Sequence, residues 1–273
     1  MKVFEVFEFL KGKGTWVNWK RTSDHILFGD PDQEITSIAV GWMPTFPNLK
    51  KAAELGCNLF ITHEPLYVGS ANQFGVFVGG PIGDYREPIQ NAMMLEEDDI
   101  WIQKAEWLKA NKMTVLRCHD VWDDFPGIGI HGAWAQWLGF LRPPIAGQKF
   151  YEIHEVQGKT LGELAYQIAE RVKELGQPGV MVFGDLKKRV NHLALGTGAI
   201  TDYRIMRQLG ADVLLITDDG TKQWESAQWS EDSGIPMIMV NHATAEEPGI
   251  RAMARYLQDQ YPEMEVQTIK RGC

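Results

Sequence analysis

Two stretches of this chain share one strand–helix–strand pattern, and this repeat restricts the fold more than any other feature of the sequence. The first stretch runs from Ile38 to Glu64, with the apolar strands IAVGWM and LFIT on either side of the amphipathic segment LKKAAEL. The second runs from Leu193 to Asp219 over the same length, with LALGTG, YRIMRQLG and VLLITDDG in the same order. Because such a unit places its two strands parallel in one sheet, the repeat predicts two halves of similar build.

The segments around the two repeats also alternate between helical and extended patterns. Trp101–Asn111 has helical spacing, MTVLRCHD is typical of a strand, and Gly132–Phe140 indicates a helix with aromatic residues on one face. LRPPIAGQ is expected to be a linker, LGELAYQIAERVKELG a helix, and the Gly-rich Gln73–Asp84 a loop or hairpin. The C-terminal region adds the strand IPMIMVNH, the helix EPGIRAMARYLQDQY and the strand EVQTI.

These elements predict an α/β fold made of two related strand–helix–strand halves, with largely parallel sheets flanked by helices. We expect residues 1–273 to form a single domain with two lobes, approximately residues 1–142 and 155–273.

Composition and charge exclude several classes of protein. No apolar run is long enough to span a membrane, so no membrane partner is expected. The net charge of −9 argues against nucleic acid as the main partner, because phosphate binding needs clustered Lys and Arg. Cys57, Cys118 and Cys273 are an odd number without CxxC spacing, which argues against a disulfide framework or a zinc ribbon and for a cytoplasmic protein.

Histidines stand at the ends of three apolar strands, FITHE, VLRCHD and IMVNH. In open α/β sheets ligands bind beyond the carboxyl ends of the strands, so the last side chains of neighbouring parallel strands should converge there. The polar residues at these ends are His63, Glu64, His119, Asp120, Asp123, Asp124, His242 and Glu246. Such imidazole and carboxylate donors suit Zn²⁺, Mn²⁺, Fe²⁺ or Co²⁺, and a bridging carboxylate could join two ions. The alternative is that these groups only form hydrogen bonds at strand ends and bind no metal.

Other motifs give weaker indications of function. The sequence QGKT ends like a P-loop but lacks its first glycine, so Thr160 is expected to cap the helix that follows. Cys118 and His119 are adjacent and point to opposite faces of a strand, which argues against a catalytic Cys–His dyad. Asp218 and Asp219 occupy the positions of His63 and Glu64 in the second repeat, where they either line the same cleft or end a strand.

The residues at the strand ends resemble those of the Nif-three-like proteins, also called GTP cyclohydrolase I type II homologues. The resemblance rests on GDP at Gly29–Pro31, LGCNLFITHEPL, CHDVWD and NHATAEEPGIRAMARYL, in the family order. The corresponding family motifs are THHPL, roughly AHTNLD, and GH with a Glu one helical turn later. The resemblance implies a centre of two divalent metal ions, Zn, Mn or Fe. Its ligands in this chain would be His63, Glu64, Asp123, His242 and Glu246.

The resemblance also implies further properties of the protein. His119 falls on the family's middle histidine and is the candidate catalytic residue near the metals. A compact fold without a central insertion domain and a ring-shaped homo-hexamer are expected as well. One departure is Glu64, which replaces a second family histidine; a carboxylate shifts affinity from Zn²⁺ towards Mn²⁺, Mg²⁺ or Fe²⁺ and puts the second metal position in question.

The function expected from these residues is metal-dependent hydrolysis of a small molecule, namely a nucleotide, a phosphoester or a cyclic amidine-type substrate. His119 would shuttle protons, and Tyr67, Trp122 and Phe125 are candidates for a stacking wall beside a substrate ring. The alternative is a non-catalytic metal-binding regulatory or scaffold ring. An open metal coordination position beside an aromatic pocket would favour the enzyme.

Overall fold

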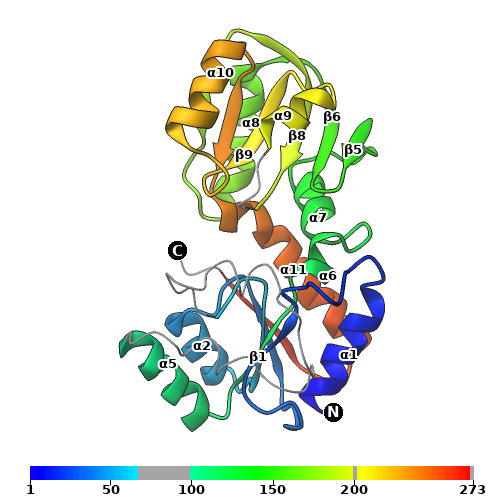
Figure 1. The fold of residues 1–273 in the computed structure, drawn as a ribbon, viewed down its shortest axis with the longest axis vertical. Coiled ribbons are helices and arrows are strands. Elements are labelled where there is room, and N and C mark those ends of the chain that lie inside the picture. The colour runs from blue at the N-terminus through cyan, green and yellow to red at the C-terminus, as the bar shows by residue number, and fades with distance from the viewer. Residues whose placement is uncertain (67–98, 199–201, 271–273) are drawn as a thin grey trace. The chain divides into compact units, whose positions relative to one another are not determined.

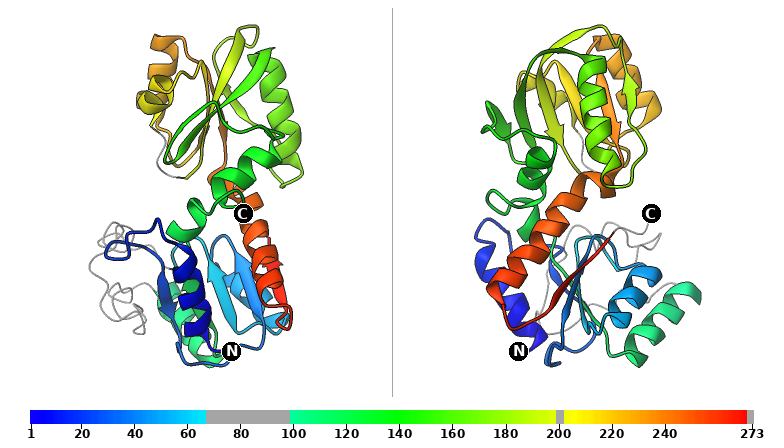
Figure 2. Two further views of the ribbon diagram at one scale, coloured as in Figure 1. Left: turned by 90° about the vertical axis from the view of Figure 1, so that its right-hand side faces the viewer. Right: turned by 180° about the vertical axis from the view of Figure 1, so that it is seen from behind.

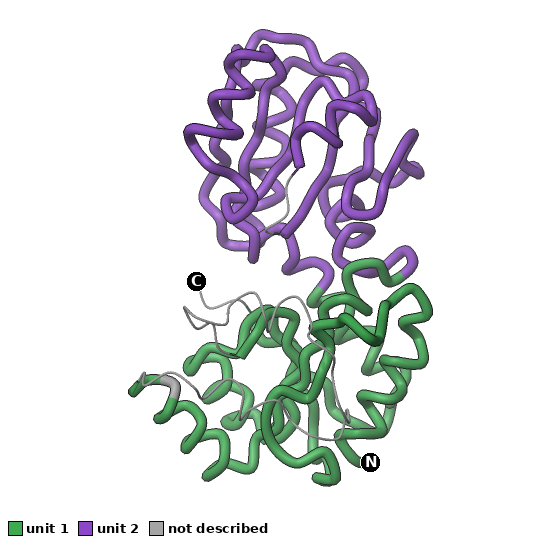
Figure 3. Tube along the Cα trace, viewed as in Figure 1, with its two compact units in different colours: residues 1–125, 250–273 green, residues 126–249 purple. Residues whose placement is uncertain are grey.

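The computed structural model describes residues 1–66, 99–198 and 202–270, which form two compact units. Unit 1 comprises Met1–Phe125 and Ile250–Cys273, and unit 2 comprises Pro126–Gly249 (Figure 3). Each unit contains one sheet with helices on both faces, so the prediction of an α/β fold with two sheets flanked by helices is confirmed (Figure 1). The predicted lobes, residues 1–142 and 155–273, have other limits than these units and stay a prediction.

Unit 1 is built around a five-stranded sheet with the strand order β1-β4-β3-β2-β11. The elements are α1 (Val3–Lys13), β1 (His25–Phe28), β2 (Ile38–Gly41), α2 (Phe46–Glu54), β3 (Leu59–Thr62), α5 (Asp99–Ala110), β4 (Thr114–Arg117), α6 (Asp120–Asp123) and β11 (Val266–Ile269). Strands β11, β2, β3 and β4 are parallel, and only the edge strand β1 among the five is antiparallel. The carboxyl ends of β3 and β4 therefore lie beside the start of β1.

Helices cover both faces of this sheet (Figures 1 and 2). Helices α2 and α5 pack on one face, where Leu49 and Leu108 join the strand residue Phe60 in one buried cluster. The opposite face is covered by α1 and by the part of α11 that belongs to unit 1 (Figure 2). All four residues of β3 are buried, which explains why the run LFIT is apolar without alternation.

Unit 2 contains a six-stranded sheet with the strand order β5-β6-β8-β9-β10-β7. The elements are α7 (Ile130–Trp137), β5 (Ala146–Gln148), β6 (Tyr151–Thr160), α8 (Leu161–Lys173), β7 (Met181–Phe183), β8 (Arg189–Gly196), α9 (Tyr203–Gln208), β9 (Val213–Thr217), a π-helix (Gln223–Ala227), α10 (Gln228–Ser233) and β10 (Met237–Val240). Helices α7 and α8 pack on one face and α9 on the other. Helix α11 (His242–Gln260) begins in unit 2 and ends among the residues of unit 1.

The two repeats form equivalent parts of the two sheets. In unit 1, β2 and β3 are parallel neighbours in the sheet, and α2 lies between them in the sequence. In unit 2, β8 and β9 are parallel neighbours, and α9 lies between them in the sequence. The predicted strand–helix–strand repeat is therefore confirmed. Thr160 caps α8 as expected, because its hydroxyl accepts a hydrogen bond from the Glu163 N–H at 3.2 Å.

The structure also corrects parts of the sequence interpretation. The linker prediction for LRPPIAGQ is wrong at its end, where Ala146–Gln148 forms β5 and pairs antiparallel with β6. The sheet of unit 2 is more mixed than expected, because β5, β6 and β7 all pair antiparallel with their neighbours. Gln73–Asp84 lies outside the described residues. Within the described ranges, no helix has both the length and the apolar character that crossing a membrane requires.

Candidate metal centre

The carboxyl ends of β3 and β4 bring the first predicted site residues together. The two strands are parallel, with Thr62 opposite Arg117, so the residues that follow them emerge side by side. Backbone hydrogen bonds continue past the strand ends, from the Cys118 N–H to the Thr62 carbonyl at 2.8 Å and from the Glu64 N–H to the Trp42 carbonyl at 2.8 Å. The backbone that carries His63, Glu64 and His119 is thus fixed by the sheet itself.

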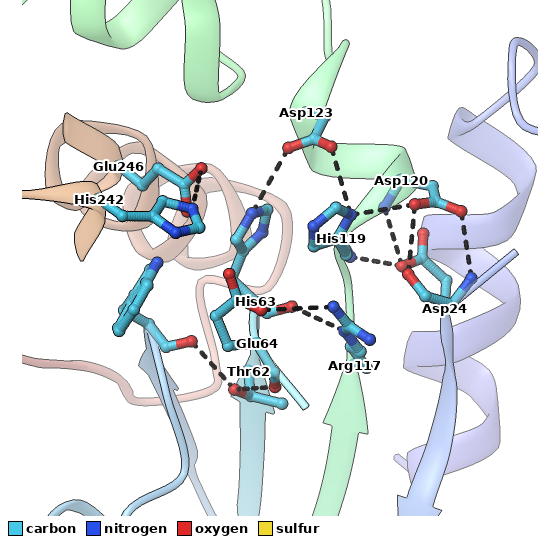
Figure 4. Close-up of polar contacts among 12 residues, drawn as sticks. Asp24, Thr62, His63, Glu64, Arg117, His119, Asp120, Asp123, His242 and Glu246 are labelled. Atoms are coloured by element: carbon cyan, nitrogen blue, oxygen red, sulfur yellow. Dashed lines mark hydrogen bonds and ion pairs between the residues drawn. The ribbon is translucent and has the colours of Figure 1, made fainter. Parts of the chain in front are cut away.

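His63, His119 and Asp123 converge at this edge of unit 1 (Figure 4). The two imidazole rings stack with their centroids 4.4 Å apart. The Asp123 carboxylate lies against both of them, with Oδ1 3.4 Å from His63 Nε2 and Oδ2 3.2 Å from His119 Nδ1. The His63 imidazole and the Asp123 carboxylate are donors of the kind that bind transition-metal ions, and the His119 ring lies directly beside both.

The ring of His63 is oriented by its surroundings. It is fully buried, and its Nδ1 lies 3.3 Å from the Cys118 carbonyl oxygen. With a proton on Nδ1 donated to this carbonyl, Nε2 is the nitrogen that can coordinate a metal ion, and metal-binding histidines are commonly held in this way.

Helix α6, which carries Asp123, is held at its first turn by a carboxylate that the sequence interpretation missed. The buried Asp24 accepts hydrogen bonds from the backbone N–H groups of His119, Asp120 and Val121, the last two at 3.0 and 2.7 Å. Burial, reinforced by the nearby Asp120 carboxylate, raises the pKa of Asp24 to about 6. Because β1 is a short antiparallel edge strand, no strand-end pattern in the sequence identifies Asp24 as a site residue.

Opposing effects set the protonation of His119. Burial alone would lower its pKa, but the charge of Asp123 and the hydrogen bond with Asp120 outweigh burial and raise the pKa to about 9. Asp120 Oδ1 lies 3.0 Å from His119 Nδ1, while Oδ2 accepts from the Thr22 hydroxyl at 2.7 Å. Burial opposes ionisation of Asp120, yet these hydrogen bonds hold its pKa well below its usual range.

Glu64 lies beside the histidines and beside a buried cation. One ligand atom each of His63, Glu64 and His119 lie within 4.8 Å of one another, and the same holds for His119, Asp120 and Asp123. These residues of unit 1 therefore fit a divalent ion. Arg117, at the end of β4, is 1% exposed and has its Nη2 3.5 Å from Glu64 Oε2. The arginine was not singled out in the sequence, although a charged residue inside the apolar run TVLRC is unusual.

His242 and Glu246 form the corresponding pair of unit 2. Both lie at the beginning of α11, and His242 Nε2 is 2.9 Å from Glu246 Oε1. Asp219 Oδ2 is 2.7 Å from His242 Nδ1, and this hydrogen bond lowers the pKa of Asp219. Asp218 accepts from the His242 backbone N–H at 2.8 Å. The two aspartates thus hold His242, in the manner of the carboxylates that orient metal-binding histidines.

Gly198 lies beside this pair of unit 2. Gly198 has a φ of +80°, a conformation that favours glycine. A Cβ atom at this position would lie 3.7 Å from Glu246 Oε1 and 3.8 Å from His242 Nε2. Gly198, the last residue of LALGTG, therefore places backbone without a side chain beside the two candidate ligands.

Other residues singled out in the sequence have different surroundings. Cys118 is buried, and burial together with the nearby aspartates raises the pKa of its thiol well above the usual value, in agreement with the rejected Cys–His dyad. Trp122 is fully buried and packs against Phe125 with ring centroids 4.6 Å apart, so it is a core residue. Phe125 is half-buried and also contacts Trp16, while Tyr67 lies outside the described residues.

The fold and these donors define an α/β protein with a candidate divalent-metal centre at the carboxyl ends of parallel strands. The sequence profile of the family described as Duf34/NIF3 (NGG1p interacting factor 3) matches residues 91–271, and the chain belongs to this family. The resemblance to the Nif-three-like proteins is thereby confirmed.

Individual relatives agree with this assignment. The chain is 25% identical over 240 residues to the GTP cyclohydrolase 1 type 2 homolog of Clostridium perfringens, covering 85% of this chain and 82% of the relative. The hypothetical protein SA1388 of Staphylococcus aureus has a similar structure, with a TM-score of 0.74, 19% identity and coverage of 98% and 96% of the two chains. A Bacillus cereus protein related to NIF3 has a TM-score of 0.72 at 14% identity, covering 100% of this chain and 97% of the other.

Proposed function

We propose that this protein is a divalent-metal-dependent hydrolase that acts on a small-molecule substrate, namely a nucleotide, a phosphoester or a cyclic amidine-type compound. The observation that carries the proposal is the convergence of His63, His119 and Asp123 within unit 1. The name of the C. perfringens relative, GTP cyclohydrolase 1 type 2 homolog, is the reason to place nucleotides among the first substrates to test.

The proposed ligands are the residues at the positions where the family has its ligands. His63 and Asp123 of unit 1 and His242 and Glu246 of unit 2 correspond to ligand positions of the family, and Glu64 lies among the donors of unit 1. Two features support this set: the imidazoles of His63 and His242 are each oriented through Nδ1, and each has a carboxylate beside Nε2. The family resemblance implies two divalent ions, which would be Zn, Mn or Fe.

A bound divalent ion supplies Lewis acidity towards the scissile group and lowers the pKa of water that it holds. We propose His119 as the proton-transfer residue, since it lies against the ligand Asp123 without being one of the corresponding family ligands. Asp120 holds the Nδ1 side of the His119 ring, so Nε2 is the atom proposed to exchange a proton with substrate or water. Asp24 keeps the backbone of this segment in place.

The test is hydrolysis of a panel of nucleotides and phosphoesters by protein stripped with chelator and then reloaded with Mn²⁺. Turnover should disappear with the metal and return with Mn²⁺. In reloaded protein, His119→Gln should lower kcat by about 10²- to 10⁴-fold at unchanged metal content. His192→Gln, a partly exposed histidine of β8, is the matched control and should retain activity.

A fully metallated protein that is inert towards the whole panel would contradict the proposed hydrolase. That result would favour the other class, a metal-binding regulatory or scaffold ring. The homo-hexamer also stays a prediction, which light scattering of the purified protein would test.

A further inference from the structure

A buried ion pair distinguishes the donor set of this chain. Arg117 is 1% exposed and Glu64 is 6% exposed, with Arg117 Nη2 3.5 Å from Glu64 Oε2. The same guanidinium donates through Nε to the His63 carbonyl oxygen at 2.9 Å (Figure 4). The Arg117 side chain therefore contacts two consecutive residues of the candidate metal centre, namely the backbone carbonyl of His63 and the side-chain carboxylate of Glu64.

This pair accounts for the departure of Glu64 from the family motif. Where the family motif THHPL has a second, neutral imidazole, this chain has a carboxylate, which adds one negative charge to a buried site. The adjacent strand supplies one positive charge at the same edge, because Arg117 stands opposite Thr62 in the parallel β3–β4 pairing. A buried carboxylate needs such a partner, since an isolated one would be strongly destabilising.

Arg117 has two consequences for metal binding at Glu64. A guanidinium does not lose its proton in a protein, so its charge is permanent and repels a cation brought up to the same carboxylate. Glu64 would also have to share its oxygens between Arg117 and a metal ion, which disfavours a bridging or bidentate carboxylate. The pair is neutral as a whole and adds no net attraction for a second dication.

We propose that Arg117 takes the place of the second metal ion, so that this centre holds a single divalent ion and Glu64 serves as the partner of Arg117. The proposal rests on the metal dependence proposed above and narrows it from two ions to one.

The experiment counts ions in the full-length protein. Protein stripped with chelator is reloaded with excess Mn²⁺, desalted and analysed for Mn²⁺ per chain by elemental analysis, and its Mn²⁺ is examined by electron paramagnetic resonance. Wild-type protein should hold one Mn²⁺ per chain with the spectrum of isolated ions. The double variant Glu64→His/Arg117→Ala, which restores the family's neutral imidazole and removes the cation, should hold two and show coupling between them.

The matched control is Arg171→Met, which removes an arginine that pairs with Glu174 on the surface of α8, and it should leave the count at one. Two Mn²⁺ in the wild-type protein would overturn the inference and leave the hydrolase proposal intact. No bound Mn²⁺ would overturn both. A double variant that folds, as judged by circular dichroism, and still holds one ion would show that Arg117 does not exclude the second. If the double variant does not fold, the number of Mn²⁺ ions per wild-type chain by itself decides between one ion and two.

Discussion

Replacing Arg117 with methionine in metal-free protein should lower the free energy of unfolding by about 3 kcal/mol. Methionine fills much of the same volume, so the main change is that Glu64, 6% exposed, loses the cation beside it. Removing one partner of a buried ion pair typically costs about 3–5 kcal/mol. We expect the lower end of that range because Arg117 Nη2 and Glu64 Oε2 are 3.5 Å apart, which is a long ion-pair distance. The substitution also removes the hydrogen bond that Arg117 Nε donates to the His63 carbonyl at 2.9 Å.

The measurement is urea denaturation in the presence of chelator, carried out as a double-mutant cycle. Glu64→Gln alone leaves Arg117 buried beside a neutral amide and should also destabilise the protein. Glu64→Gln/Arg117→Met removes both charges and should regain much of the loss, because no charged group of the pair then remains buried. Arg171→Met is the control and should change stability by less than about 0.5 kcal/mol, since this side chain is 46% exposed.

Added Mn²⁺ provides a second readout of the same pair. If Mn²⁺ replaces the lost charge, it should stabilise Arg117→Met more than wild-type protein, and a concentration 100 times Kd contributes about 2.7 kcal/mol. The reasoning is refuted if metal-free Arg117→Met unfolds within about 0.5 kcal/mol of wild type, or if the two single substitutions add without coupling.

Three further predictions concern other parts of the site and fold. In chelator, the raised pKa of His119, about 9 against 6.5 in the unfolded chain, contributes stability that is complete below pH 6.5 and disappears as pH rises through 9. The difference in Tm between wild type and His119→Gln should shrink over that range, and an unchanged difference would contradict the raised pKa. Asp219→Asn should weaken Mn²⁺ binding by about 10- to 100-fold in calorimetry, because the carboxylate at 2.7 Å orients His242; unaltered affinity would exclude His242 as a ligand. Thr160→Ala should cost about 1 kcal/mol in thermal unfolding, whereas Thr160→Ser should retain the α8 cap; equal stability of the two variants would show that the cap contributes nothing.

The candidate site shows which positions a sequence can indicate in a fold of this kind. His63 stands where a fully buried strand ends, and such a strand is visible as a short apolar run closed by proline. His119 is found for the same reason at the end of β4. The recurrence of one strand–helix–strand unit indicated two sheets of similar build, because helix and strand periodicity are properties of neighbouring residues in the chain.

Asp24 and Arg117 gained their roles only through tertiary structure. Asp24 reaches the N–H groups of α6 because β1 pairs antiparallel with β4 across a long sequence separation. Four-residue edge strands have too little periodicity to be recognised locally, and no local pattern specifies which strand they join.

The chain by itself therefore determined the element types and which side chains stand at the ends of apolar strands. The folded structure decided strand order and register, and with them that Arg117 lies against Glu64. The physical reason is that local periodicity follows from neighbouring residues, whereas pairing between strands depends on contacts that form only when distant segments meet.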